Sequence, residues 1–279
     1  MIRSKPSSGL SVSWRRIPSD KPRNWQEGWK FACTVWGEVI SMLATMIRPF
    51  LMLGCVPIVV MIFHDLYMND LASGEETVWY DGILGYGILC GFLIPWFRAI
   101  LGRGYSQETG RTLLVRFLRF IFAAFIFNFV VFFPAVVVVL VIILGFSSTT
   151  VSFEFEEVWH FIAIALPLFV LALYVFARSL LAFPMIAADA VDTVRDALFA
   201  DARKIAGPTR SGIFFLILPG FAVATAVEIL IGISTIPPIG TTVLLVVMEY
   251  IFYAWNCACL AVAYRRLIGE EPLNKEATT

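Results

Sequence analysis

The sequence predicts an all-α integral membrane protein with six transmembrane helices arranged as three hairpins. Of its 279 residues, 59% are hydrophobic and only 15% are charged. A soluble domain needs more polar surface than this to cover its core, so a bilayer is the expected surrounding. The 21 basic and 21 acidic residues balance, so the composition does not indicate a nucleic-acid partner.

Six apolar runs approach or exceed the roughly 20 residues that cross a bilayer. Backbone polar groups in a bilayer must be paired within the segment, so these runs are expected to be helices. The first run is short, and tilt or the preceding helix must supply its missing length. The runs are residues 49–64, 83–101, 120–144, 158–181, 212–235 and 240–263, within a membrane domain of residues 49–268.

The basic residues lie at alternate ends of the apolar runs: before the first run, between the second and third, between the fourth and fifth, and after the sixth. Eight precede Pro49, five lie from Arg98 to Arg119, five from Arg178 to Arg210, and three follow Tyr264, which accounts for all 21. Basic residues concentrate in the cytoplasmic segments of membrane proteins. The N-terminal tail (1–23) and the C-terminal tail (269–279) are therefore both expected in the cytoplasm.

An amphipathic helix is predicted over residues 24–48, before the first run. Asn24 and Glu27 have the spacing of a capping box at its start. A helix with tryptophans on its apolar face and basic flanks is typical of the membrane interface. The alternative is that it continues the first span as one bent helix. The apolar face holds Trp25, Trp29, Cys33, Trp36, Ile40, Leu43 and Ile47, and the polar face Glu27, Lys30, Thr34, Ser41, Thr45 and Arg48.

A second amphipathic helix is predicted in the cytoplasm between the fourth and fifth spans. Thr193 and Asp196 form a helix start signal, and Gly207-Pro208 forms a stop signal. We expect this helix to lie along the membrane surface or to pack under the bundle. Its apolar positions are Val191, Val194, Leu198 and Ile205.

The second, fourth and sixth spans end in similar residues. Their arginines, Arg98, Arg178 and Arg265, are 80 and 87 residues apart. This spacing indicates three repeated hairpins, each ending in an arginine that reaches toward lipid phosphates. The alternative is that inward-running helices commonly end in arginine. The three ends are Phe97-Arg98-Ala99-Ile100-Leu101, Ala177-Arg178-Ser179-Leu180-Leu181 and Tyr264-Arg265-Arg266-Leu267-Ile268.

Three segments of the chain resemble a known family. They are Pro95 to Gly102, Ala177 to Pro184, and Thr193-Val194-Arg195-Asp196-Ala197-Leu198 with the loop to Arg210. These segments are similar to uncharacterised bacterial six-span inner-membrane proteins related to the membrane domain of glycerophosphodiester phosphodiesterases. The resemblance covers about half of the chain. It implies a six-helix domain in a bacterial inner membrane, and no activity, since the family's phosphodiesterase chemistry lies in a separate soluble barrel.

No catalytic or cofactor motif is recognised in the sequence. Phosphate-binding loops, serine nucleophile elbows and helical zinc motifs are all missing. The five cysteines form no C-x-x-C pair, and two histidines are too few for a haem or histidine-rich metal site. We therefore expect no catalytic residue, no cofactor and no bound metal.

The remaining candidate site consists of polar residues inside the predicted spans. Glu228 and Glu249 are expected about 12 to 14 Å below the outer surface on neighbouring helices, from about 1.5 Å of rise per residue. Burial without a nearby cation favours their neutral form. They either carry protons or cations through the bundle or join helices by hydrogen bonds. The other members of this group are Tyr253, Asn256 and Asn128.

These features predict a non-enzymatic inner-membrane protein that acts as a scaffold or as an accessory, lipid-interacting subunit. Its expected partners are membrane lipids and a protein on the cytoplasmic face, with no nucleic acid. The alternative is a small proton- or cation-coupled transporter or a lipid-handling permease that uses Glu228 and Glu249.

Overall fold

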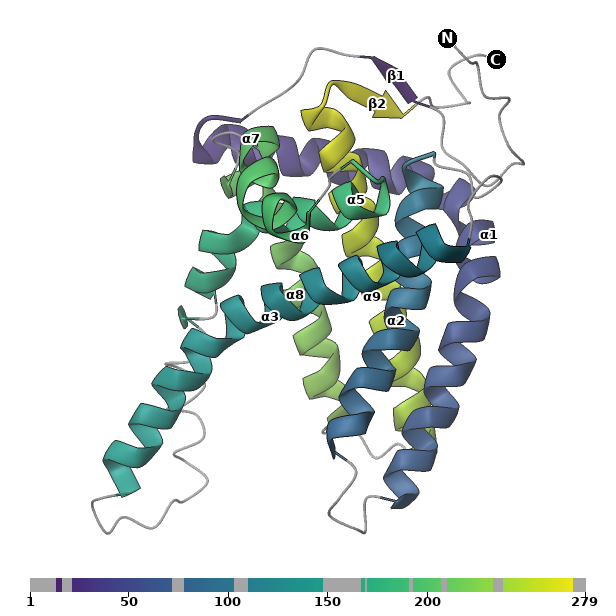
Figure 1. The fold of residues 1–279 in the computed structure, drawn as a ribbon, viewed down its shortest axis with the longest axis vertical. Coiled ribbons are helices and arrows are strands. Elements are labelled where there is room, and N and C mark those ends of the chain that lie inside the picture. Colours follow the sequence, from purple (N-terminus) through teal and green to yellow (C-terminus); the bar gives the residue numbers. More distant parts are fainter. Residues whose placement is uncertain are drawn as a thin grey trace.

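The protein is helical throughout its described ranges, apart from one pair of three-residue strands (Figure 1). The computed structural model describes residues 14–16, 22–71, 78–102, 110–147, 167–168, 170–190, 193–206, 210–232 and 238–272. The elements in chain order are β1 (Trp14–Arg16), α1 (Trp25–Leu71), α2 (Val78–Ile100), α3 (Gly110–Ser147), η1 (Ala177–Leu181), α5 (Ala182–Ala187), α6 (Val194–Asp196), η2 (Ala197–Asp201), α7 (Ala202–Ala206), α8 (Arg210–Gly232), α9 (Pro238–Leu267) and β2 (Glu270–Pro272).

Four helical stretches are long and apolar enough to cross a membrane. They are Trp25–Tyr67, Thr112–Val130, Val170–Ala187 and Ile239–Leu267. A fifth is added if Val194–Ile205 and Arg210–Ala224, which meet at a sharp bend, form one span. The apolar part of α2, Leu84–Ile100, is shorter. The described ranges are thus compatible with a multi-pass membrane protein, with four or five candidate spans.

Large apolar side chains line the outward face of α3. They recur every three or four residues, and the rings of Phe125, Phe129 and Phe133 stack in sequence along the helix. A continuous exposed apolar face of this length marks a membrane or an interaction surface. The exposed members are Leu114, Leu118, Phe122, Phe125, Phe129 and Phe133.

One unbroken helix, α1, contains both the predicted amphipathic segment and the first apolar run. Its first part crosses the end of the bundle and its second part runs down beside α2 (Figure 1). Half of the predicted capping box is present, since Asn24 Oδ1 accepts a hydrogen bond of 2.8 Å from the Glu27 backbone N–H. The Glu27 carboxylate accepts from the Arg23 backbone N–H at 2.7 Å, one residue before the place that a capping box uses. Pro49 lies inside α1 and cannot donate the helical hydrogen bond, which accounts for a change of direction.

The first part of α1 has a second apolar face that packs on the bundle. Every third or fourth residue along this face is buried. The apolar face expected from the tryptophan pattern points away from the protein, since Trp25, Trp29 and Ile40 are exposed. This part of α1 is therefore apolar on two faces, one toward the protein and one away from it. The buried residues are Ala32, Val35, Val39, Met42 and Met46.

The core lies among α1, α2, α8 and α9, which contact one another. Phe92 and Trp96 of α2 stack with ring centroids 5.9 Å apart, and Tyr250 of α9 packs on Phe92 at 5.2 Å. The long helix α3 crosses this bundle obliquely, and its C-terminal half extends away from it (Figure 1). The short helices α5, α6 and α7 lie near the end of the bundle that carries β1 and β2 (Figure 1).

The predicted helix between the fourth and fifth spans is present as α6, η2 and α7. Its start signal is confirmed, since Thr193 Oγ1 accepts a hydrogen bond of 3.1 Å from the Asp196 backbone N–H. Val194 and Leu198 are buried against neighbouring elements, including α5. The segment thus packs on the bundle, which is one of the two expected placements. Val191 lies outside the described residues.

The fourth apolar run does not end at Leu181 as predicted. The chain passes through the tight turn of η1 and continues as α5 to Ala187. Pro184 permits this continuation because it lies in the first turn of α5, where a missing N–H costs little. Most of the first half of this run, residues 158–166 and 169, lies outside the described residues.

The strands β1 and β2 bring two distant parts of the sequence together. They pair antiparallel, with Arg15 opposite Glu271 and Arg16 opposite Glu270. Since β2 follows α9 directly, residues 14–16 lie at the end of the molecule where the last helix finishes (Figure 1).

Candidate functional site

The polar contacts of the described residues concentrate where α2, α5 and α9 end. The end of α5 is closed by a left-handed residue, Asp189, with φ of 54°. The Ala190 N–H donates to Met185 O at 2.9 Å and the Asp189 N–H to Ile186 O at 3.1 Å. This pattern is a Schellman motif, in which glycine usually takes the left-handed position. An aspartate there costs some backbone strain, and its carboxylate is used.

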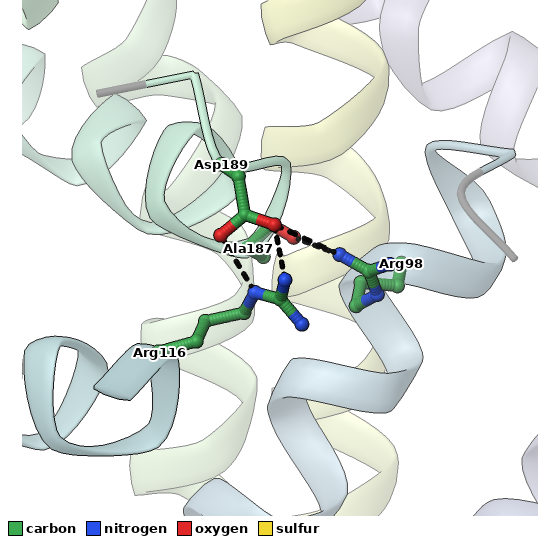
Figure 2. A network of polar contacts seen from close by, with 4 residues as sticks. All are labelled: Arg98, Arg116, Ala187 and Asp189. Carbon is green, nitrogen blue, oxygen red and sulfur yellow. Dashed lines mark hydrogen bonds and ion pairs between the residues drawn. The ribbon is translucent and has the colours of Figure 1, made fainter. Parts of the chain in front are cut away.

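Two buried arginines converge on this turn from α2 and α3 (Figure 2). Arg98 and Arg116 are each only 3% exposed. Arg116 holds the Asp189 carboxylate with two nitrogens, its Nε at 2.8 Å from Oδ1. Arg98 donates to Ala187 O at 3.0 Å and lies 3.6 Å from Asp189 Oδ2. The end of α5 is thus fixed to both α2 and α3.

Arg98, predicted as a lipid-phosphate contact, is turned toward protein groups in this structure. Its guanidinium is buried and bonded to a carbonyl and a carboxylate of the protein, so a lipid cannot reach it without displacing them. Arg265 likewise donates to Leu101 O at the end of α2. Both arginines satisfy carbonyls at the negative end of another helix.

The neighbouring arginine of α9 makes a third contact of this kind. Arg266 holds Glu38 of α1 with two nitrogens, its Nε at 2.7 Å from Oε1. Both side chains are mostly buried. The C-terminal end of α9 is therefore tied to the first part of α1 as well as to α2.

The predicted repeat of helix ends has a structural counterpart in two of its three copies. Gly102 and Gly269 have φ of 68° and 84° and close α2 and α9. Each glycine lies four residues after the repeated arginine. In the middle copy Ala182 takes this position with φ of −61°, and the chain continues as α5. Replacing glycine by alanine at this place favours continuation of the helix.

The third repeated arginine, Arg178, has a different environment. It lies within electrostatic reach of Arg210 and Arg203. Arg178 and Arg210 are half-buried, and the Nε of each is enclosed without a hydrogen-bond partner. Among the described residues, no carboxylate pairs with any of these three arginines. Asp201, the acidic residue of the same segment, pairs with Lys204 at 3.2 Å.

Aromatic rings flank this arginine group. The Arg210 guanidinium lies 5.4 Å from the centre of the Tyr174 ring. Trp25 stacks on Tyr174, with the two ring centroids 5.1 Å apart. Trp25 is 51% exposed and Trp29 is 49% exposed. Exposed tryptophans beside arginines are typical of the membrane interface.

The structure brings together three of the predicted intramembrane polar residues and adds a fourth. Asn128 of α3 donates to the Tyr86 hydroxyl of α2 at 2.6 Å. Tyr86 is in electrostatic reach of Glu249 of α9, which is hydrogen-bonded to Tyr253. Sequence reasoning missed Tyr86 because a lone tyrosine in an apolar run gives no signal. Glu228 lies in α8, but its side chain is outside the described part of the structure.

The last predicted member, Asn256, lies one helical turn after Tyr253 and packs against α8. A Cβ atom added to Gly220 would be 2.3 Å from Asn256 Oδ1. Asn256 thus packs directly on the α8 backbone next to Pro219, and its Oδ1 is buried without a partner. Close contact between α8 and α9 at this level depends on the absence of a side chain at Gly220.

A cavity of about 190 Å³ lies between the two parts of α1 and the helices α2 and α9. Its walls include Leu43, Phe50, Trp96, Ile251 and Trp255. This lining is apolar. In the described part of the chain, no three metal-ligating side chains gather at one place.

Comparisons with protein-family models, with curated proteins and with solved structures find no match for this chain.

Proposed function

We propose that this chain is a non-enzymatic, six-span protein of a bacterial inner membrane that serves as a scaffold or accessory subunit and interacts with lipids. The observation that carries the proposal is the set of arginine contacts at the helix ends. Arg98, Arg265 and Arg266 each bond a group of a different element. Such contacts fix one end of the bundle, as a scaffold requires, whereas alternating access requires helices that move relative to one another.

Six spans are supported by the pairing of β1 with β2. A chain whose two ends meet on one side of a membrane crosses it an even number of times. With α2 counted despite its shorter apolar part, the crossings are α1, α2, α3, the helix ending at Ala187, α8 and α9. The positions of the basic residues favour the cytoplasm for both ends. The resemblance to six-span inner-membrane proteins is consistent with this count.

Lipid interaction is supported by the outward face of the first part of α1. This face carries Trp25, Trp29, Leu43 and Ile47, all exposed. In the proposed orientation, the helix lies in the headgroup region of the cytoplasmic leaflet with these side chains toward the acyl chains. The basic segments on the cytoplasmic side of the protein would contact anionic lipids and a protein partner.

The proposal is tested with the purified protein in vesicles of phosphatidylcholine with increasing phosphatidylglycerol. We expect the unfolding midpoint to rise with the anionic lipid, because only the native state presents its basic face. A pH-sensitive dye inside the vesicles should report no proton flux above that of empty vesicles. Proton flux that depends on the protein would overturn the proposal. So would an unfolding midpoint that does not change with the fraction of anionic lipid.

A coupled transporter is the second candidate, supported by the polar group of Tyr86, Asn128, Glu249 and Tyr253 on three helices. Glutamine keeps the shape and hydrogen bonding of glutamate but cannot carry a proton. If Glu228 or Glu249 is a proton carrier, Glu→Gln variants should fold normally and fail to rescue a deletion strain. Glu→Gln variants that rescue fully would exclude this candidate.

A further inference from the structure

We propose that Arg178, Arg203 and Arg210 form a binding site for the phosphate group of a membrane-lipid headgroup. This inference rests on the proposed lipid interaction and names its chemistry and its place. The site lies where η1, α7 and the start of α8 meet, at the end of the molecule where the other helix ends are tied together.

The first observation is a contrast with the arginines that bond groups within the protein. Arg98, Arg116, Arg265 and Arg266 each hold a carbonyl or carboxylate of another element. The three arginines of the proposed site have no such partner among the described residues. Protein carbonyls and carboxylates therefore bond the arginines at the other helix ends, whereas no such group among the described residues bonds these three arginines.

The second observation is the position of Arg178 relative to Arg203 and Arg210: η1, which holds Arg178, contacts both α7 and α8, and both charges act on Arg178. Like charges held close together repel, and partial burial strengthens the repulsion because water screens it less. Arg178 and Arg210 each hold an Nε–H that is enclosed and unbonded, as Arg98 and Arg265 do, but those two donate to a protein carbonyl through another nitrogen. A bound anion would offset the repulsion and accept hydrogen bonds from the remaining guanidinium nitrogens. The group thus has the charge and the donors of an anion site.

The aromatic neighbours carry the third step, which selects phosphate at a membrane surface. The Arg210 guanidinium lies over the Tyr174 ring, with its central carbon 5.4 Å from the ring centroid. This cation–π contact leaves guanidinium N–H donors for a phosphate, which arginine binds with two parallel hydrogen bonds. Trp25, stacked on Tyr174 and half exposed, places the site at headgroup level.

The experiment titrates the full-length protein in detergent with short-chain phosphatidic acid and follows the unfolding midpoint and the bound lipid by native mass spectrometry. Wild type should bind the phosphatidic acid and show little response to phosphatidylcholine of the same chain length. Arg178→Ala, Arg203→Ala and Arg210→Ala should each weaken binding about tenfold, from the loss of one charge-assisted contact. Arg195→Ala is the matched control, because Arg195 is exposed on the same segment outside the group.

Each outcome of this experiment decides the inference. If wild type prefers phosphatidic acid but the three variants bind it equally well, the inference fails and the proposed lipid interaction stands. If wild type has no preference for anionic lipid, both fail. Inorganic phosphate is titrated in parallel, and binding as tight as that of the lipid would overturn the lipid assignment. Arg203 is exposed, so Arg203→Ala tests the site even if the half-buried positions do not tolerate alanine.

Discussion

At the scale of single residues, Asp189 combines a costly backbone conformation with a carboxylate that serves two buried arginines. Asn also tolerates the left-handed conformation, so Asp189→Asn removes the charge and little else. We expect the variant to lose about 1–3 kcal/mol of stability, less than for a fully buried pair because the Asp189 side chain is 49% exposed. The unfolding midpoint in detergent measures this loss.

Asp189→Gly provides the control for this prediction. Glycine relieves the backbone strain at φ of 54° but also lacks the carboxylate. If the ion pairs matter most, Asp189→Gly is destabilised like Asp189→Asn. A glycine variant more stable than wild type would contradict the assigned role of the carboxylate.

The contact between Gly220 and Asn256 gives a second prediction at this scale. Gly220→Ala places a Cβ 2.3 Å from Asn256 Oδ1, so the variant should lose about 1–3 kcal/mol from overpacking. Asn256→Ala makes space for that Cβ, so the double variant should recover part of the loss. A double-mutant cycle on unfolding midpoints measures the coupling. If the losses of the two single variants simply add up in the double variant, the destabilisation by Gly220→Ala does not come from a clash with Asn256.

At the scale of elements, the first part of α1 shows what a sequence pattern can and cannot separate. The tryptophans and basic residues predicted a helix with one apolar face. The buried face instead uses small and medium residues such as Ala32 and Val35, which gave no distinct signal beside the larger aromatic side chains. Residue type alone does not tell a face that packs on protein from one that packs on lipid.

The three tryptophans of this part of α1 are predicted to differ in how strongly lipid-attached quenchers reach them. Trp25 and Trp29 are half exposed, whereas Trp36 is half-buried and donates to Leu216 O at 3.2 Å. In variants that keep one tryptophan each, with the others replaced by Phe, shallow lipid-attached quenchers should quench Trp25 and Trp29 more than deep ones do. Trp36 should be quenched least. Stronger quenching of Trp25 by deep quenchers would place this part of α1 across the bilayer.

The helix ends show a similar division between what was predicted and what was not. Each end was expected from its arginine, and Gly102 and Gly269 close two of them. The direction of Arg98 was not predictable, because its partners Ala187 and Asp189 follow it by about 90 residues in the sequence and meet it only in the folded bundle. Asp189 itself lies in a short turn that no recognised sequence motif marks.

At the scale of the whole molecule, the apolar runs predicted helices and their approximate order, because bilayer-crossing length is a strong and local signal. The sequence did not predict that α3 would begin at Gly110, ten residues before its apolar run at Phe120. It also missed the arginine group, since Arg203 belongs to the short helix α7 and Arg210 to the start of α8, and only the fold brings them to Arg178. Contacts between distant segments leave no periodic trace.

The orientation in the membrane is the prediction on which the other proposals at this scale depend. The basic residues predict both ends in the cytoplasm, and the β1–β2 pairing is consistent with both ends on one side. In a background with the five cysteines replaced, single cysteines at Glu75, Ser152 or Pro238 should react with an impermeant thiol reagent added outside the cell. Cysteines at Gly104 or Thr209 should react only after the membrane is opened.

Reaction of a Gly104 or Thr209 cysteine in intact cells would reverse the orientation and move the Arg178 group away from the cytoplasmic leaflet. Reaction at only some of the three outer positions would instead change the number of crossings, and an odd number would break the agreement with the strand pair.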